Sequence, residues 1–182
     1  MLRSAVDVGV ENNWREEILN KQSLRYINPN ILEVGKAHPV YRFVRPNTFD
    51  VQKAEIKARI LMGTYILQPN RAKFNQFEVD PTCRLCDEEP ETREHFVAVC
   101  SALDDCRKKY NEGLVCTINM SIDQVKTLGN DKYTQLVLDC THPSVNIYTD
   151  NPNFNIEEHE MQTRQLLHKL HFKRLRILEN TN

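Results

Sequence analysis

The sequence predicts a mainly α-helical protein that carries an inserted Cys-Cys-His-Cys zinc knuckle and a long amphipathic C-terminal helix. Three observations support this prediction. Apolar residues recur at helical spacing in several segments, possible metal ligands follow one another in "CRLCDEEPETREHFVAVC" (83–100), and the last stretch, "IEEHEMQTRQLLHKLHFKRLRIL", has one apolar side. With 182 residues, 40% of them hydrophobic and 27% charged, the chain has the size and composition of a globular protein with a buried core.

The N-terminal stretch "MLRSAVDVGVENNW" is too short and too polar for the apolar region of a secretory signal. No window of the chain approaches the eighteen uninterrupted apolar residues of a membrane-spanning helix. We therefore expect an intracellular protein, in the nucleus or the cytoplasm, with no membrane partner. In a reducing compartment, closely spaced cysteines indicate a metal site rather than a disulfide.

Four segments are expected along the chain: an N-terminal helical segment (1–34), a helix with the zinc knuckle (35–112), a helical pair with a linker (113–153) and a basic C-terminal helix (154–182). In the first segment, a helix from about Asn12 to Ile27 has Trp14, Ile18 and Leu24 on its inner side and ends at "NPN" (28–30). The following stretch, 31–47, contains Gly and Pro and predicts a loop with some extended chain.

The strongest helical pattern is "TFDVQKAEIKARILMGTYIL" (48–67). Its inner face is predicted from spacing to contain Ala54, Ala58, Leu61, Met62 and Tyr65. Gly63 costs such a helix about 1 kcal/mol relative to alanine, so we expect it to mark a close approach to another part of the chain.

Further helices are expected after the cysteine-rich region. The first, "SALDDCRKKYNEG", is predicted to end at Gly113, and a helical pair at 121–139 is broken near "GND". Residues 141–155 have the composition of a linker. The last helix runs from about Ile156 to Leu178. Its predicted inner side is made of Ile156, Thr163, Leu167, Leu170 and Ile177.

The metal prediction rests on the spacing of Cys83, Cys86, His95 and Cys100, with gaps of two, eight and four residues. A Cys-x2-Cys turn lets both thiolates point at one tetrahedral ion, and Thr92 suits the N-cap of a helix that carries the other two ligands. Residues i and i+5 of an α-helix are about 140° apart around its axis, so the imidazole must reach across or the helix must loosen near Cys100.

Two alternatives to the metal site remain open. Cys86 and Cys100 could be small buried apolar residues with His95 on the surface, and a redox-active Cys-x2-Cys is less favoured because no βαβ pattern surrounds it. With four ligands, three of them thiolates, the single zinc ion would be structural. Cys106, Cys116 and Cys140 lack ligand spacing and are predicted to be core thiols, with Cys106 as the only plausible substitute ligand among them. We found no catalytic motif and no phosphate-binding loop, and therefore predict a protein that is not an enzyme.

The net charge of −1 hides local clusters of basic residues. Residues 53–73 and the last helix are basic, whereas residues 78–94 are acidic, so any nucleic-acid-binding surface would be local. The alternative is that these charged residues only form the solvent-exposed faces of helices and bind no ligand.

The stretch "CRLCDEEPETREHFVAVCSAL" resembles the zinc-binding region near the C-terminus of reverse transcriptases encoded by non-LTR (LINE-type) retrotransposons, which has a C-x-x-C knuckle followed by an "ETxEHF…C" helix. "KARILMGTYILQPNRAKFNQ" is similar to the helix and the "TG-x-Y-x-L" stretch before that knuckle, with Met62 where the family often has Thr. "GKAHPVYR" resembles the segment before the helix. The resemblance covers about Gly35 to Tyr110 and implies Cys83, Cys86, His95 and Cys100 as ligands.

The resemblance implies a non-catalytic tail of a retrotransposon-derived polyprotein, because nothing here resembles the polymerase motif "Y/F-x-D-D". Such a tail is expected to bind RNA template or target DNA through basic helices, with Tyr65 or Phe74 as stacking partners. The candidate contacts are Lys57, Arg59, Arg71, Lys73, Arg164, Lys169, Lys173, Arg174 and Arg176. The alternatives are a structural or protein-interaction module, stapled by zinc and docking through the C-terminal helix, and a retroelement remnant without function.

Overall fold

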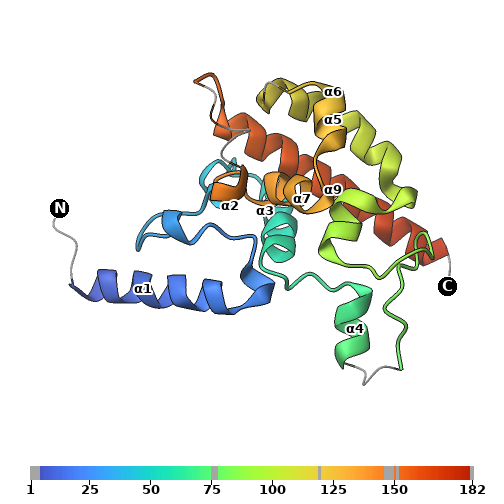
Figure 1. Cartoon of the computed structure of the whole chain (residues 1–182), viewed down its shortest axis with the longest axis horizontal. Helices are drawn as coiled ribbons and strands as arrows, with labels where there is room; N and C mark the ends of the chain where they lie inside the picture. The colour runs from blue at the N-terminus through green and yellow to red at the C-terminus, as the bar shows by residue number, and fades with distance from the viewer. Residues whose placement is uncertain (1–4, 75–77, 119, 146–149, 151, 181–182) are drawn as a thin grey trace.

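The computed structural model describes residues 5–74, 78–118, 120–145, 150 and 152–180, and the prediction of a mainly helical protein is confirmed (Figure 1). In that part of the chain the β-structure is limited to one antiparallel bridge, between Thr82 and Pro90. The α-helices are α1 (Ala5–Asn20), α2 (Pro39–Arg42), α3 (Thr48–Leu61), α4 (Gln68–Phe74), α5 (Asp104–Ile118), α6 (Ile122–Thr127), α7 (Asn130–Leu138) and α9 (Ile156–Asn180). Shorter turns are η1 (Gln22–Leu24), η2 (Pro29–Ile31), η3 (His95–Val99), η4 (Ser101–Leu103) and η5 (Pro143–Val145).

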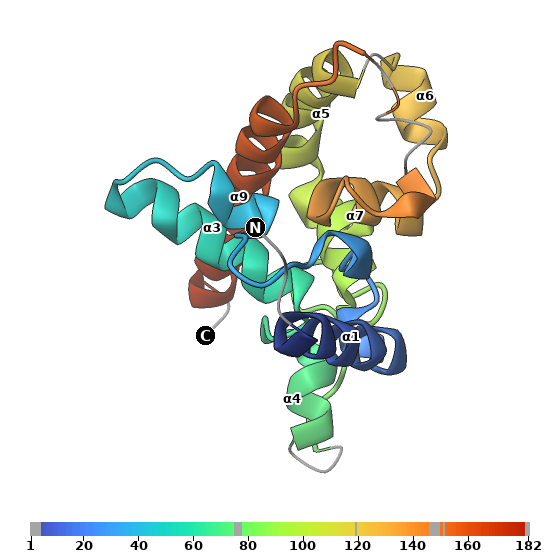
Figure 2. The same ribbon diagram turned by 90° about the vertical axis from the view of Figure 1, so that its left-hand side faces the viewer.

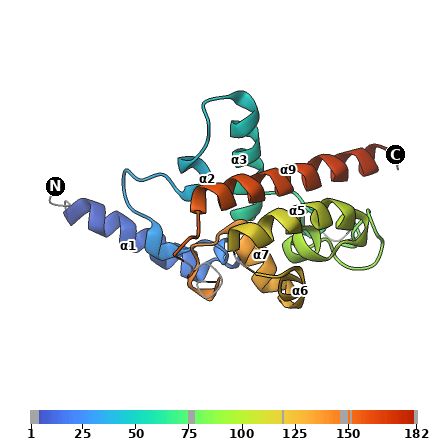
Figure 3. The ribbon, with the colours of Figure 1, turned by 90° about the horizontal axis from the view of Figure 1, so that it is seen from above.

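The long helix α9 lies at the centre of the molecule, between α3 on one side and α5 on the other (Figure 3). Its residues Leu166, Leu167 and Leu170 are fully buried, as expected for an apolar stripe that faces a core. These leucines of the C-terminal helix therefore pack inside the protein. None of the described helices has the length and apolar character needed to cross a membrane.

Helix α3 ends earlier than its sequence pattern predicts. Asn47 caps the helix by accepting a hydrogen bond from the Asp50 N–H at 2.9 Å, and the helix stops at Leu61. Gly63 follows with a φ of +71°, and a Cβ atom there would lie 3.0 Å from the Ser23 carbonyl oxygen. The expected close approach at Gly63 is confirmed, and Met62, expected on the inner face, is 47% exposed because the helix has ended.

Helix α1 begins earlier and ends earlier than the predicted Asn12–Ile27 helix, and a 3₁₀ turn follows it. Ile18 is buried as expected, but Trp14 is 41% exposed. The inner side is also occupied by Glu11, whose carboxylate accepts a hydrogen bond from the Val34 N–H at 3.0 Å. The prediction failed because the apolar residues of this helix do not form one stripe, so their spacing does not mark the packed side.

Helix α5 continues through Gly113 to Ile118, so the predicted helix end at Gly113 is wrong. A Cβ atom on Gly113 would lie 3.1 Å from the side-chain oxygen of Gln162 on α9. The glycine therefore allows two helices to pack closely instead of ending one of them. The pair α6 and α7 forms as predicted, with Ser121 and Gln124 in a capping box. The predicted linker falls partly on residues 146–149 and 151, which lie outside the described residues.

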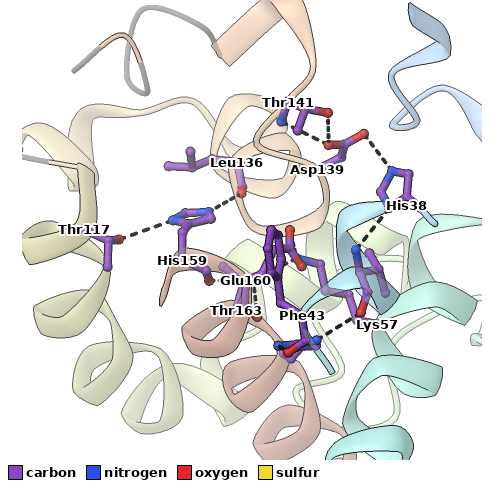
Figure 4. A network of polar contacts seen from close by, with 12 residues as sticks. His38, Phe43, Lys57, Thr117, Leu136, Asp139, Thr141, His159, Glu160 and Thr163 are labelled. Carbon is purple, nitrogen blue, oxygen red and sulfur yellow. Dashed lines mark hydrogen bonds and ion pairs between the residues drawn. The ribbon is translucent and has the colours of Figure 1, made fainter. Parts of the chain in front are cut away.

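Buried polar groups connect α9 to the helices around it (Figure 4). Lys57 of α3 donates hydrogen bonds to both carboxylate oxygens of Glu160 at 2.9 Å and to the Thr163 hydroxyl at 2.7 Å. His159 lies 3.0 Å, through Nε2, from the Leu136 carbonyl oxygen and 3.3 Å, through Nδ1, from the Thr117 hydroxyl. Each of these groups is buried, so the hydrogen bonds specify how the helices pack.

The substitution Lys57→Met should lower the free energy of unfolding by about 3–5 kcal/mol, because it leaves the buried Glu160 carboxylate without its cation. Urea denaturation measures this loss. The double variant Lys57→Met, Glu160→Met should recover most of it, and Lys126→Met, at an exposed pair with Asp123, should change stability by less than about 1 kcal/mol. Equal losses at Lys57 and Lys126 would contradict this account of the core.

Burial lowers the pKa of His159 to about 4, below the value of about 6.5 expected in the unfolded chain. The unfolded chain therefore binds the proton more readily, and the stability due to a neutral His159 is lost as pH falls from about 6.5 to about 4. The loss should amount to about 3 kcal/mol. We would measure the free energy of unfolding by urea denaturation between pH 7 and pH 5. It should depend less on pH in His159→Gln than in the wild type. The same pH dependence in both proteins would refute the effect assigned to His159.

Candidate metal centre and exposed basic residues

Cys83, Cys86, His95 and Cys100 come together in one cluster, in which one ligand atom from each residue lies within 4.8 Å of all the others. The Cys83 and Cys100 sulfurs are 3.8 Å apart, and the Cys86 sulfur is 3.3 Å from His95 Nε2. Three of the four side chains are buried and Cys86 is partly buried, so the cluster could hold one metal ion away from bulk water.

The knuckle is shaped by its backbone. The Asp87 N–H donates to the Cys83 carbonyl at 2.8 Å, and the Cys83 N–H donates to the Glu89 carbonyl at 2.8 Å. The backbone N–H groups of Leu85 and Cys86 also donate to the Cys83 sulfur, which favours its thiolate form. Asp87 has a φ of +57°, a left-handed conformation that short polar side chains tolerate. This tight turn directs both cysteine sulfurs to the same point.

The segment that carries His95 and Cys100 is a π-helical turn, His95–Val99, in which the Cys100 N–H donates to the His95 carbonyl at 2.8 Å. A hydrogen bond from residue i+5 to residue i widens the turn, so these two positions come closer to one face than in an α-helix. The loosening expected from the ligand spacing is therefore present. Thr92 caps the turn as predicted, since its hydroxyl accepts from the His95 N–H at 3.1 Å.

Two contacts next to the ligands could not be foreseen from the sequence. His95 Nδ1 lies 3.6 Å from a carboxylate oxygen of Glu89, too far for a hydrogen bond, so Glu89 places a negative charge beside the imidazole. Arg107 of α5 donates a hydrogen bond to the carbonyl of Cys100. Glu89 belongs to the knuckle and Arg107 to a helix that begins after it, and no spacing rule connects either of them to the ligands.

The three thiols of the cluster do not ionise independently. A hydrogen bond from the Cys100 thiol lowers the pKa of Cys83 to about 5, and the same bond, together with burial, raises the pKa of Cys100. Burial raises the pKa of Cys86. The hydrogen bond between the two sulfurs therefore favours the thiolate form at Cys83, whereas burial favours the neutral thiol at Cys86 and Cys100.

The residues between the two halves of the cluster fix it to the body of the protein. The buried carboxylate of Glu91 bonds to Arg174 of α9 at 2.6 and 2.8 Å and accepts from the Gln68 N–H at the start of α4 at 2.9 Å. Arg93 donates to the carbonyl oxygens of Ser23 at 2.8 Å and Leu61 at 3.1 Å. The metal centre is thereby joined to α3, α4 and α9.

Three of the basic residues predicted to contact nucleic acid are buried, and this part of the prediction is corrected. Lys57 is paired with Glu160, Arg174 is paired with Glu91, and Arg164 donates to the carbonyl oxygens of Val40 at 3.1 Å and Phe43 at 3.0 Å. Their cations are used inside the protein and do not form part of a surface. The sequence could not reveal this because helical spacing does not distinguish a buried ion pair from a solvated charge.

The other predicted basic residues reach the surface. Arg59, Arg71, Lys73, Lys169 and Arg176 are exposed, and Lys173 is partly buried and bonds to Asp105. Of the two proposed stacking residues, Tyr65 is buried and packs on Phe96 with ring centroids 5.4 Å apart, whereas Phe74 is 81% exposed.

The remaining cysteines lie outside the cluster. Cys140 is buried and Cys106 is partly buried, which agrees with their prediction as core thiols, and the side chain of Cys116 lies outside the described residues. The family models, curated proteins and solved structures with which the chain was compared include no match.

We expect the purified protein to contain one divalent metal ion per chain, measured by elemental analysis after removal of loosely bound ions. Cys83→Ser should lose the ion and the protection of amides 83–100 against hydrogen exchange, because the knuckle is then held by three ligands. Cys106→Ser is the matched control and should retain both. Metal contents that are the same in these two variants would exclude the cluster as the binding site.

Proposed function

We propose that the ion is zinc, that it is structural, and that the protein is a non-catalytic nucleic-acid-binding module of the type found in the tails of retrotransposon reverse transcriptases. The closed Cys3His cluster is the observation on which this proposal rests. A tetrahedral site with Zn–S bonds of about 2.3 Å has sulfur–sulfur edges of about 3.8 Å, and the Cys83 and Cys100 sulfurs are 3.8 Å apart. Four protein ligands, three of them thiolates, fill the coordination sphere and leave no position for a catalytic water.

The contacts of the cluster suggest how zinc would support binding. Gln68 at the start of α4 is held by Glu91, directly after the knuckle, so the position of α4 depends on the zinc-bound segment. Helix α4 projects from the body of the molecule and presents Arg71 and Lys73 to solvent (Figures 1 and 2). Arg71 and Arg84 line a cleft between α4 and the knuckle, together with Gln68, Thr82 and the acidic residues Asp80 and Asp87. The exposed cations of α4 itself, Arg71 and Lys73, are suited to contact phosphates.

The acidic knuckle favours a different candidate, a module that binds another protein. Asp87, Glu88 and Glu89 are exposed beside the metal centre and would repel phosphates. In this alternative zinc has the same structural role, and the partner would contact exposed parts of the protein, since Leu166, Leu167 and Leu170 of α9 are buried. A retroelement remnant without a retained function is the third alternative.

A titration of single-stranded RNA with increasing salt tests the nucleic-acid proposal. We expect an affinity better than about 100 μM at low salt that falls steeply as salt rises, because bound counterions are released from the phosphates. Arg71→Ala and Lys73→Ala should each weaken binding and reduce the slope of log K against log salt by about 0.7.

The matched control is Lys126→Ala, which removes an exposed cation on α6, in a different part of the molecule. Its affinity and salt slope should equal those of the wild type. An affinity that stays worse than about 100 μM at low salt would reject nucleic-acid binding and favour the protein-binding alternative. The absence of both zinc and any nucleic-acid affinity would favour the remnant.

A further inference from the structure

A row of rings crosses the boundary between α3 and α9 on a part of the surface that the proposed function has not yet used. Phe49 of α3 contacts His168 of α9 with ring centroids 5.0 Å apart, and His168 contacts Phe172 at 4.6 Å. The row continues from Phe172 to His171 at 5.0 Å. Phe49 is 56% exposed and Phe172 is 41% exposed, whereas His168 between them is buried.

Basic side chains border this row. Lys53 lies 4.1 Å from the centroid of the Phe49 ring, and Asp50 partly neutralises it at 3.0 Å. Lys169 and Arg176 lie three residues before and four residues after Phe172, so they share its side of α9. Both are exposed, and within the described part of the chain neither makes an ion pair, in contrast to the neighbouring Lys173, which bonds to Asp105. The surface therefore combines exposed rings with two cations that remain available to a ligand.

The core does not account for these exposed rings. The central packing of α9 on α3 and α5 uses leucines 166, 167 and 170, while Phe49 and Phe172 stand at its edge. An exposed phenylalanine contributes little to the free energy of folding. Because neighbouring side chains already hold its ring in place, little side-chain entropy is lost when a base stacks on it. Exposed aromatic rings interleaved with lysine and arginine are the combination that binds single strands, since every base has a face to stack and every nucleotide has a phosphate.

We propose that Phe49 and Phe172 stack bases of single-stranded nucleic acid whose phosphates contact Lys169 and Arg176. This inference rests on the proposed function and specifies it: the ligand is a single strand, because the bases of a duplex are stacked on one another and cannot reach the rings. The strand would bind to the α3–α9 surface in addition to α4.

The test uses the full chain with bound metal and a fluorescent oligouridylate of roughly twenty nucleotides, long enough to cover one site. Phe172→Leu and Phe49→Leu keep an apolar side chain and remove the ring. Each should weaken binding about fivefold or more without changing the salt slope, because stacking releases no counterions. Lys169→Ala should reduce the slope by about 0.7. The affinity for duplex RNA of the same length should not change with either phenylalanine substitution.

Two matched variants keep the result interpretable. Tyr41→Leu removes a ring that is 48% exposed on α2 and should leave binding unchanged, and Phe172→Tyr keeps a stacking ring and should retain wild-type affinity. If both leucine variants bind as the wild type does while Arg71→Ala weakens binding, the α3–α9 surface is not the stacking site and the proposed function stands. If the wild type does not bind the oligouridylate at all, the proposed function and this inference both fail.

Discussion

The buried ion pair between Glu91 and Arg174 is the contact on which the arrangement of the metal centre depends. Glu91 follows the knuckle directly, and its carboxylate also accepts the backbone hydrogen bond of Gln68. A buried carboxylate without its cation is strongly destabilising, so this pair requires the knuckle, the start of α4 and the C-terminal part of α9 to be correctly placed together. The guanidinium lies 5.7 Å from the ring centroid of Tyr65, which packs on Phe96, the residue that follows His95 of the cluster.

The short segment 91–96 links the Cys-Cys-His-Cys cluster to the packed core, because some of its residues contact the cluster and others contact the core. In "ETREHF", His95 belongs to the Cys-Cys-His-Cys cluster, Thr92 caps the turn, and Arg93 donates to carbonyl oxygens of η1 and of the end of α3. The π-helical turn that follows is less favourable than an α-helix on its own, and it is compatible with the fold because it brings Cys100 to the other ligands. This turn thus coincides with the Cys-Cys-His-Cys cluster, as is common for π-helical turns at functional sites.

The protein divides its cations between two uses. Lys57, Arg164 and Arg174 hold helices together in the interior, where desolvation is offset by carboxylates or by backbone carbonyls. The second group of cations, on α4 and on the outer side of α9, is exposed to solvent. A near-neutral chain can therefore present local basic surfaces, because many of its charges are paired with each other.

The sequence by itself determined the helical class, the long last helix and the four residues of the Cys-Cys-His-Cys cluster, because each depends on local spacing. It also indicated a close approach at Gly63, although only the tertiary structure showed that Ser23 is the neighbour. It also implied the looser turn before Cys100, from the angle between residues i and i+5. Only the tertiary structure decided that Gly113 lies inside a helix packed on α9, that Trp14 faces solvent, and which cations are buried. These outcomes depend on which distant residue fills the neighbouring space, and a spacing pattern carries no information about that partner.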